Sequence, residues 1–114
     1  MPSPILKNKK CVPCQGGVPP LPEEVCLELK KQIHPDWYFT HNKTRLKRDL
    51  KFTGMKAPLE LAIKIGELAD SEWHHPELHL GFGHLEVEVW THKINNLVES
   101  DFIFCAKLDE LIST

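Results

Sequence analysis

Residues 84–92 read HLEVEVWTH, and this stretch sets the pattern of the fold. Leu85, Val87 and Val89 alternate with Glu86 and Glu88. Because side chains of a strand point alternately to opposite faces, one face here is apolar and the other charged. The stretch therefore predicts an antiparallel strand with one face buried and one face in water.

Three further segments show the features of strands. Residues 44–52 alternate in the same way, with Leu46, Leu50 and Phe52 on one face. A turn at 41–43 connects this strand to one that begins at Trp37. A short strand over 78–82 precedes residues 84–90, and glycines flank the turn between them. The sequence thus predicts two hairpins.

Helical periodicity is found over 22–33, 58–72 and 100–112. In the first of these, Val25 and Leu29 mark an inward stripe. The last is apolar almost all round over 102–106, which is typical of a helix that packs on two surfaces. We expect one surface to be the sheet and the other a second subunit. The order α-β-β-α-β-β-α predicts an α+β fold, a four-stranded antiparallel sheet with three helices on one face.

Length and composition fit one domain of 114 residues with a net charge of −2. Residues 1–21 are rich in proline and glycine and are predicted to be an N-terminal arm without regular structure, with the domain over 22–114. The charge gives no reason to expect nucleic-acid binding. No apolar run could span a membrane and no secretory signal is present, so a cytoplasmic location is expected, with an organelle left open.

The four cysteines offer a weaker signal. Cys11 and Cys14 form a C-x-x-C motif, but no second pair completes a four-ligand zinc site. The nearby proline and glycines indicate a loop rather than the strand-to-helix setting of a redox motif. Metal binding or redox chemistry at this pair is left open as the less favoured interpretation. Cys26 and Cys105 lie in apolar helical patterns, where a thiol usually packs as a small hydrophobe.

Three of the seven histidines in the chain are the candidate catalytic residues. His74 and His75 follow the second predicted helix, and His92 ends the strand quoted above. Asp70 and Asp101 are the nearby carboxylates. Histidine gives or takes a proton near neutral pH, and a neighbouring carboxylate holds its ring in one tautomer. Such a group could protonate a leaving hydroxide and remove a ring N–H proton without a metal, although a three-histidine zinc site is the alternative.

The combination of DSEWHHP at 70–76, Trp90-Thr91-His92 and Asp101 resembles the pterin-4a-carbinolamine dehydratase family. The spacing from the acidic residue to His-His-Pro and from Thr-His to the aspartate nine residues later matches the family pattern throughout. The segment KCVPCQGGVPPL at 10–21 is similar to the N-terminal part of bacterial and plant-type members. His-His-Pro alone is a weak signal, but the combined pattern is specific and covers nearly the whole chain.

The resemblance implies dehydration of 4a-hydroxytetrahydrobiopterin to the quinonoid dihydropterin, which recycles tetrahydrobiopterin, with no cofactor and no metal. It also implies a homodimer or homotetramer, which we expect to form through the C-terminal helix. We expect His74 and His92 to be the proton-transfer pair and His75 to orient the pterin. The implied site comprises the catalytic residues His74, His75 and His92, and the supporting residues Asp70, Asp101, Pro76, Trp90 and Thr91.

Two other functions stay open at this point. Animal members of the family also act as a dimerisation cofactor for a homeodomain transcription factor, and a His/Cys metal protein is the second alternative. The chain departs from the family pattern at Asn95-Asn96, where many members have two glycines, and asparagine can also adopt positive φ. Val98 stands where a serine or threonine often opens the last helix, so we expect the helix cap at Ser100.

Overall fold

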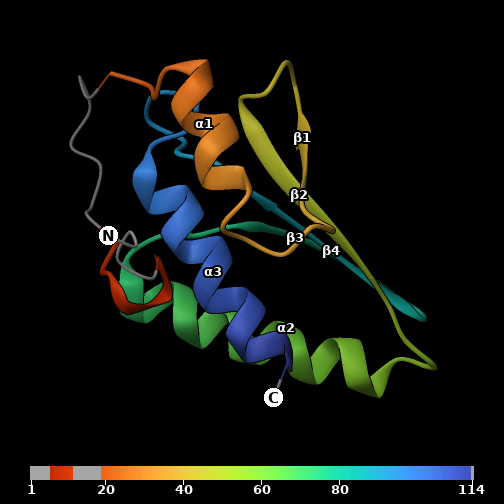
Figure 1. The fold of residues 1–114 in the computed structure, drawn as a ribbon. Helices are drawn as coiled ribbons and strands as arrows, with labels where there is room; N and C mark the ends of the chain where they lie inside the picture. Colours follow the sequence, from red (N-terminus) through yellow and green to blue (C-terminus); the bar gives the residue numbers. More distant parts are fainter. Residues whose placement is uncertain (1–5, 12–18, 114) are drawn as a thin grey trace.

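The computed structural model describes residues 6–11 and 19–113 (Figure 1). The elements follow the predicted order, with a short 3-10 turn added at the start. They are η1 (Leu6–Asn8), α1 (Glu23–Lys30), β1 (Tyr38–Thr40), β2 (Arg45–Lys51), α2 (Lys56–Glu72), β3 (Glu77–Gly81), β4 (His84–Val89) and α3 (Glu99–Ser113).

The four strands form one antiparallel sheet in the order β1-β2-β4-β3. In the register, Leu85 of β4 lies between Leu50 of β2 and Leu80 of β3. Three helices lie on the same side of this sheet (Figure 1). The α+β fold class predicted from the alternating strands is therefore confirmed.

The core lies between the sheet and the helices. Leu46, Leu85, Val87 and Val89, which the alternation assigned to one face, are all fully buried. They belong to the same apolar cluster as the aromatic rings of α3, including Phe104. Burying such side chains contributes about 1.5–3 kcal/mol each, so the apolar face of β2 and β4 fixes the position of α3 over the sheet.

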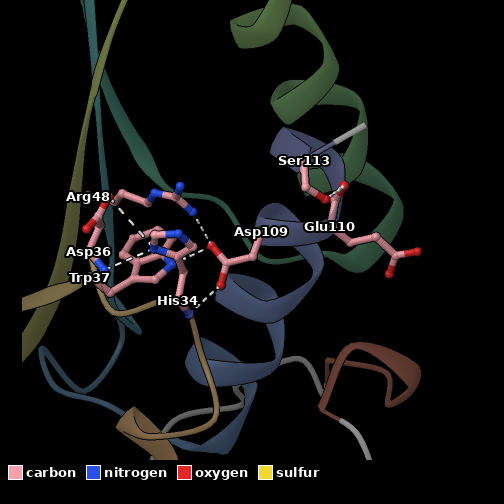
Figure 2. A network of polar contacts seen from close by, with 7 residues as sticks. All are labelled: His34, Asp36, Trp37, Arg48, Asp109, Glu110 and Ser113. Carbon is pink, nitrogen blue, oxygen red and sulfur yellow. Dashed lines mark hydrogen bonds and ion pairs between the residues drawn. The ribbon is translucent and has the colours of Figure 1, made fainter.

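A buried ion pair also fastens α3 to the sheet (Figure 2). Arg48 of β2 is 7% exposed, and its Nη1 donates a hydrogen bond to Oδ1 of Asp109 at a distance of 2.6 Å. The indole N–H of Trp37 donates to the same oxygen over 2.7 Å, and the backbone N–H of His34 donates to Oδ2 over 2.9 Å. The carboxylate of Asp109 thus connects α3 with β2 and with the segment that leads into β1.

The first helix is shorter than its pattern predicted. It ends at Lys30 instead of continuing to residue 33, and Lys31 caps it. Val25, expected to face inward, is 37% exposed, whereas Cys26 is buried. Ile33 is still buried although it lies beyond the helix. At the C-terminal end of this segment, the apolar spacing therefore predicted the burial of Ile33 correctly, but it predicted a helical conformation that the chain does not have there.

The expectation that residues 1–21 lack regular structure is wrong at Leu6–Asn8, which form the turn η1. Leu6 begins the turn η1 and is 3% exposed, and Cys11 is also buried. This segment packs along α3, and Nζ of Lys9 lies 2.7 Å from a carboxylate oxygen of Glu99. Apolar burial and ion pairing thus fold residues 6–11 onto the domain. Residues 1–5 and 12–18, which include Cys14, lie outside the described residues.

The chain itself covers the apolar turns of α3. Phe102, Ile103, Phe104 and Cys105 are each at most 2% exposed within a single chain. The turn η1 packs against this helix and supplies part of the second surface that the sequence led us to expect. Assembly through α3 stays a prediction, because its apolar turns are already buried without a second subunit. None of the helices in the described residues is long and apolar enough to cross a membrane.

Candidate active site

The C-terminal end of α2 presents the two adjacent histidines. Trp73 caps the helix in the left-handed conformation, with φ 52° and ψ 39°. Its backbone N–H and that of His74 both donate to the carbonyl oxygen of Ala69. A left-handed cap usually carries glycine, and a tryptophan there is uncommon. The sharp turn sends the chain away from the helix axis just before His74, and Pro76 then leads into β3.

His74 is held by a buried carboxylate. Its Nε2 lies 2.6 Å from Oδ1 of Asp101, and the two side chains are 9% and 0% exposed. Oδ2 of Asp101 accepts hydrogen bonds from the Thr91 hydroxyl and from the Val98 backbone N–H, each over 2.8 Å. An ionised carboxylate only accepts, so Nε2 of His74 carries the hydrogen in this pair. Nδ1 is then the ring nitrogen that can exchange a proton.

The start of α3 places Asp101. The helix begins at Glu99, so the predicted cap at Ser100 is wrong. The carboxylate of Asp101 reaches back to the N–H of Val98, which is one half of a capping box and satisfies a donor that the helix leaves free. Asn95 has φ 53°, as expected for a residue in the place of a glycine. The loop is closed by backbone hydrogen bonds between Thr91 and Asn96.

His75 stands in a more open setting. Its Nε2 lies 2.9 Å from Oδ1 of Asp70, one turn back on α2. The side chains of His75 and Asp70 are 54% and 84% exposed. Water screens such a pair, so it contributes little to stability and leaves the imidazole free to turn toward a ligand.

His92 lies against an aromatic platform. Its ring stacks on Trp90 with a centroid distance of 4.1 Å and an interplanar angle of 15°. The guanidinium carbon of Arg45 lies 3.8 Å from the Trp90 ring centroid, and Nη1 of Arg45 donates to Glu88 over 3.3 Å. Arg45 of β2 was not among the predicted site residues, because in the sequence it is one of several charged residues on the solvent-facing side of the strand.

A cavity of about 250 Å³ brings the three histidines together. Pro76, Asp70 and Asp101 are not among the residues that line it: Asp101 lies behind His74, and Asp70 contacts His75. Two lining residues, Trp73 and Lys93, were not predicted as site residues although each adjoins a predicted histidine. The walls are Trp73, His74, His75, Trp90, Thr91, His92 and Lys93.

Metal ligation was the open alternative for the histidines and cysteines. Across residues 6–11 and 19–113, no group of three or more His, Cys, Asp or Glu side chains is arranged to hold a metal ion. Burial, followed by the charge of Glu72, raises the pKa of the Cys11 thiol to about 12. Burial also raises the pKa of Cys26 and of Cys105, in keeping with thiols that pack as small hydrophobes. Cys14, and with it the C-x-x-C pair, lies outside the described residues.

A small α+β domain with a histidine-lined cavity at the ends of α2 and β4 is the class of protein defined by this fold and site. Residues 19–111 match the family model of pterin 4 alpha carbinolamine dehydratase. The chain therefore belongs to this family of hydro-lyases, as the motif at 70–101 indicated.

Curated relatives agree over nearly the full chain. A Methylococcus capsulatus protein assigned as a pterin-4-alpha-carbinolamine dehydratase is 46% identical over 106 residues, which cover 93% of this chain and 92% of the relative. A Rickettsia bellii protein with the same assignment is 44% identical over 93% of each chain. The fold also resembles a crystal structure from Brucella melitensis named transcriptional coactivator/pterin dehydratase. That match has a TM-score of 0.74 at 20% identity and covers 82% of this chain and 98% of the other.

Proposed function

We propose that this protein dehydrates 4a-hydroxytetrahydrobiopterin to the quinonoid dihydropterin by histidine acid–base catalysis without a metal, and so recycles tetrahydrobiopterin. The observation that carries the proposal is the single cavity lined by His74, His75 and His92, in which one histidine is fixed by a buried carboxylate. Membership of the dehydratase family supplies the reaction class.

The reaction requires one proton to be given and one to be taken. Protonation of the C4a hydroxyl lets it leave as water, and the C4a–O bond breaks. Loss of the proton from the neighbouring ring nitrogen supplies the electron pair for the new C=N bond. Both transfers are within reach of imidazole side chains near neutral pH, and each typically contributes 10²–10⁴ in rate.

The geometry supports a division of roles among the histidines. Asp101 orients His74 and stabilises its ring when the ring is charged, so His74 is one member of the proposed proton-transfer pair. His92, whose ring stacks on Trp90 and also lines the cavity, is the other member. His75 is exposed and paired only with Asp70, and in this proposal it orients the pterin. The indole rings of Trp73 and Trp90 offer flat surfaces to a bicyclic substrate.

The test is the decay of enzymatically generated 4a-hydroxytetrahydropterin, followed by ultraviolet absorbance. We expect wild-type protein to accelerate the decay with or without chelator. His92→Ala should be about 10²–10⁴-fold slower, because it removes a proton-transfer group, and His75→Ala should also be slower, because the pterin loses its orientation. His79→Ala is the matched control, because His79 is an exposed histidine of β3 outside the cavity. Loss of activity with chelator, together with stoichiometric zinc in the purified protein, would contradict the metal-free mechanism.

An unaccelerated decay with wild-type protein would instead favour a binding role. The alternative is a dimerisation cofactor for a homeodomain protein, and the Brucella structure of the same fold carries coactivator in its name. A pull-down with a homeodomain partner tests it. A cytoplasmic location and assembly into a homodimer or homotetramer through α3 belong to the proposal as well, and analytical ultracentrifugation tests the assembly.

A further inference from the structure

We propose that Cys11 is a positioning residue for the active site: together with Glu72 it ties the end of α2 to the first turn of α3 and so sets the separation of His74 and Asp101. This inference rests on the proposed dehydratase function for its catalytic consequence. The sequence suggested that the N-terminal segment is an arm. In this proposal the segment helps to position the active-site residues.

Cys11 contacts both elements that carry the His74–Asp101 pair. Its backbone N–H donates to Oε1 of Glu72 over 3.0 Å, and Glu72 is the last residue of α2, two positions before His74. Its thiol donates to the carbonyl oxygen of Ser100 over 3.5 Å, and Ser100 immediately precedes Asp101. One residue of the N-terminal segment thus bridges the same two elements as the His74–Asp101 hydrogen bond.

Glu72 strengthens this bridge from the side of α2. Its second carboxylate oxygen lies 3.5 Å from Nζ of Lys107 in α3, and the two side chains are 14% and 18% exposed. Burial alone would raise the pKa of Glu72, but the Cys11 N–H and the Lys107 ammonium more than offset this and hold the pKa below its ordinary value. The carboxylate is therefore charged at neutral pH and joins three segments of the chain.

The bridge is anchored on the far side of Cys11. Leu6 is buried in the core, and Lys7 and Lys9 form ion pairs with Glu110 and Glu99 of α3. Burial of Leu6 and Cys11 holds residues 6–11 along α3, and the two exposed ion pairs add little to this.

The chemistry of the thiol fits positioning and not reaction. Cys11 is 8% exposed and hydrogen-bonded, and a raised thiol pKa leaves almost no thiolate at neutral pH. A general acid or base displaced by about 1 Å can lose about 10²-fold in rate. A bridge that sets the distance between α2 and α3 can therefore control turnover without contacting the pterin.

The experiment compares Cys11→Ala, Cys11→Ser and Glu72→Leu with Cys26→Ala in the full-length chain. Cys26 is a buried cysteine of α1 whose thiol faces the carbonyl of Leu21, so its variant loses the same atoms but removes no contact with Glu72 or Ser100. We expect kcat to fall roughly tenfold in Cys11→Ala and up to about 10²-fold in Glu72→Leu, with KM changed less than about twofold. Cys11→Ser keeps a donor to Ser100 and should regain most of the kcat.

A second readout does not depend on turnover. The Nε2–H proton of His74 in the hydrogen bond to Asp101 is followed by proton–nitrogen NMR of the imidazole. We expect its resonance to shift in Cys11→Ala and Glu72→Leu and to stay in place in Cys26→Ala. An unshifted resonance with kcat equal to wild type in both bridge variants would overturn the inference. If the wild-type protein showed no dehydratase activity, the proposed function would fail, while the NMR comparison would still decide whether the bridge sets the pair.

Discussion

Nε2 of His74 and Oδ1 of Asp101 lie 2.6 Å apart, and this hydrogen bond joins the turn after α2 to the first turn of α3. Neither side chain is more than 9% exposed. The carboxylate of Asp101 accepts two further hydrogen bonds, from Thr91 and Val98. The same atoms thus orient a candidate catalytic ring, cap a helix and close a loop.

Asp101→Asn should therefore damage both activity and stability. An asparagine side chain offers one acceptor oxygen, so at least one of the three buried donors loses its partner. An unsatisfied buried group costs about 1–3 kcal/mol, and loss of the ring orientation should lower kcat by about 10²–10⁴. Urea denaturation and the dehydration assay measure the two effects. Asp70→Asn alters the equivalent carboxylate of the exposed pair, and its unfolding free energy should stay within about 1 kcal/mol of wild type.

Arg45→Met should act on His92 through Trp90. The substitution keeps an apolar chain but removes the cation from the face of the indole, a contact worth about 0.5–2 kcal/mol. We expect a several-fold loss of kcat and a broadened His92 ring resonance in NMR spectra. Lys47→Met, two residues along the same strand, is the control for loss of a positive charge. Equal kinetic effects of the two substitutions would show that net charge, and not the stack, is responsible.

The sequence was sufficient for the fold class and for most of the cavity lining, although Trp73 and Lys93 were missed. Alternation over 84–90 is decisive because a shift of one residue would turn every apolar side chain of β4 into water. The histidines could be placed because they lie just after the predicted helix and strand, which the structure has as α2 and β4. The hydrogen bond from His74 to Asp101 joins residues 27 positions apart. The family resemblance assigned both residues to the site, but it did not indicate that they form a pair.

Other features depend on partners that the local pattern does not contain. Arg48 lies on the inward face of β2. Its charge can be buried there because Asp109, 61 positions away, forms an ion pair with it. A charge on an apolar strand face was the one available signal. Leu6 and Cys11 were assigned to an arm because prolines surround them, although apolar burial against α3 overrides that local preference. The left-handed Trp73 has no local signal, since that conformation favours glycine.

Asp109→Ala should be strongly destabilising, because it leaves the guanidinium of Arg48 buried without its counter-charge (Figure 2). Breaking a buried pair in this way typically costs about 3–5 kcal/mol. Urea denaturation of wild type and variant measures it. Glu110→Ala removes the neighbouring carboxylate, whose pair with Lys7 is exposed, and should cost less than about 1 kcal/mol. A double substitution Arg48→Met/Asp109→Leu should recover much of the loss if the unpaired charge is its cause.

Glu72 should make the fold sensitive to acid. A carboxyl group whose pKa is lower in the folded than in the unfolded chain binds protons more readily when unfolded. Its contribution to stability is therefore complete above the ordinary value of 4.5 and is lost as the pH falls through the lowered folded pKa. Glu72→Gln removes this contribution at all pH values. The difference in unfolding free energy between wild type and Glu72→Gln should thus be largest at pH 7, narrow below about pH 4.5, and approach a constant minimum in stronger acid.

Urea denaturation at pH 7, 5, 4 and 3 gives this difference directly. Glu110→Gln is the control, because its exposed carboxylate is screened by water and should show a small difference at every pH. A Glu72→Gln difference that stayed the same from pH 7 to pH 3 would mean that the substitution acts through packing, and that Lys107 and the Cys11 N–H do not stabilise a charged Glu72. A narrowing difference would show that the charged form of Glu72 stabilises the fold, as its contacts with the Cys11 N–H and the Lys107 ammonium predict.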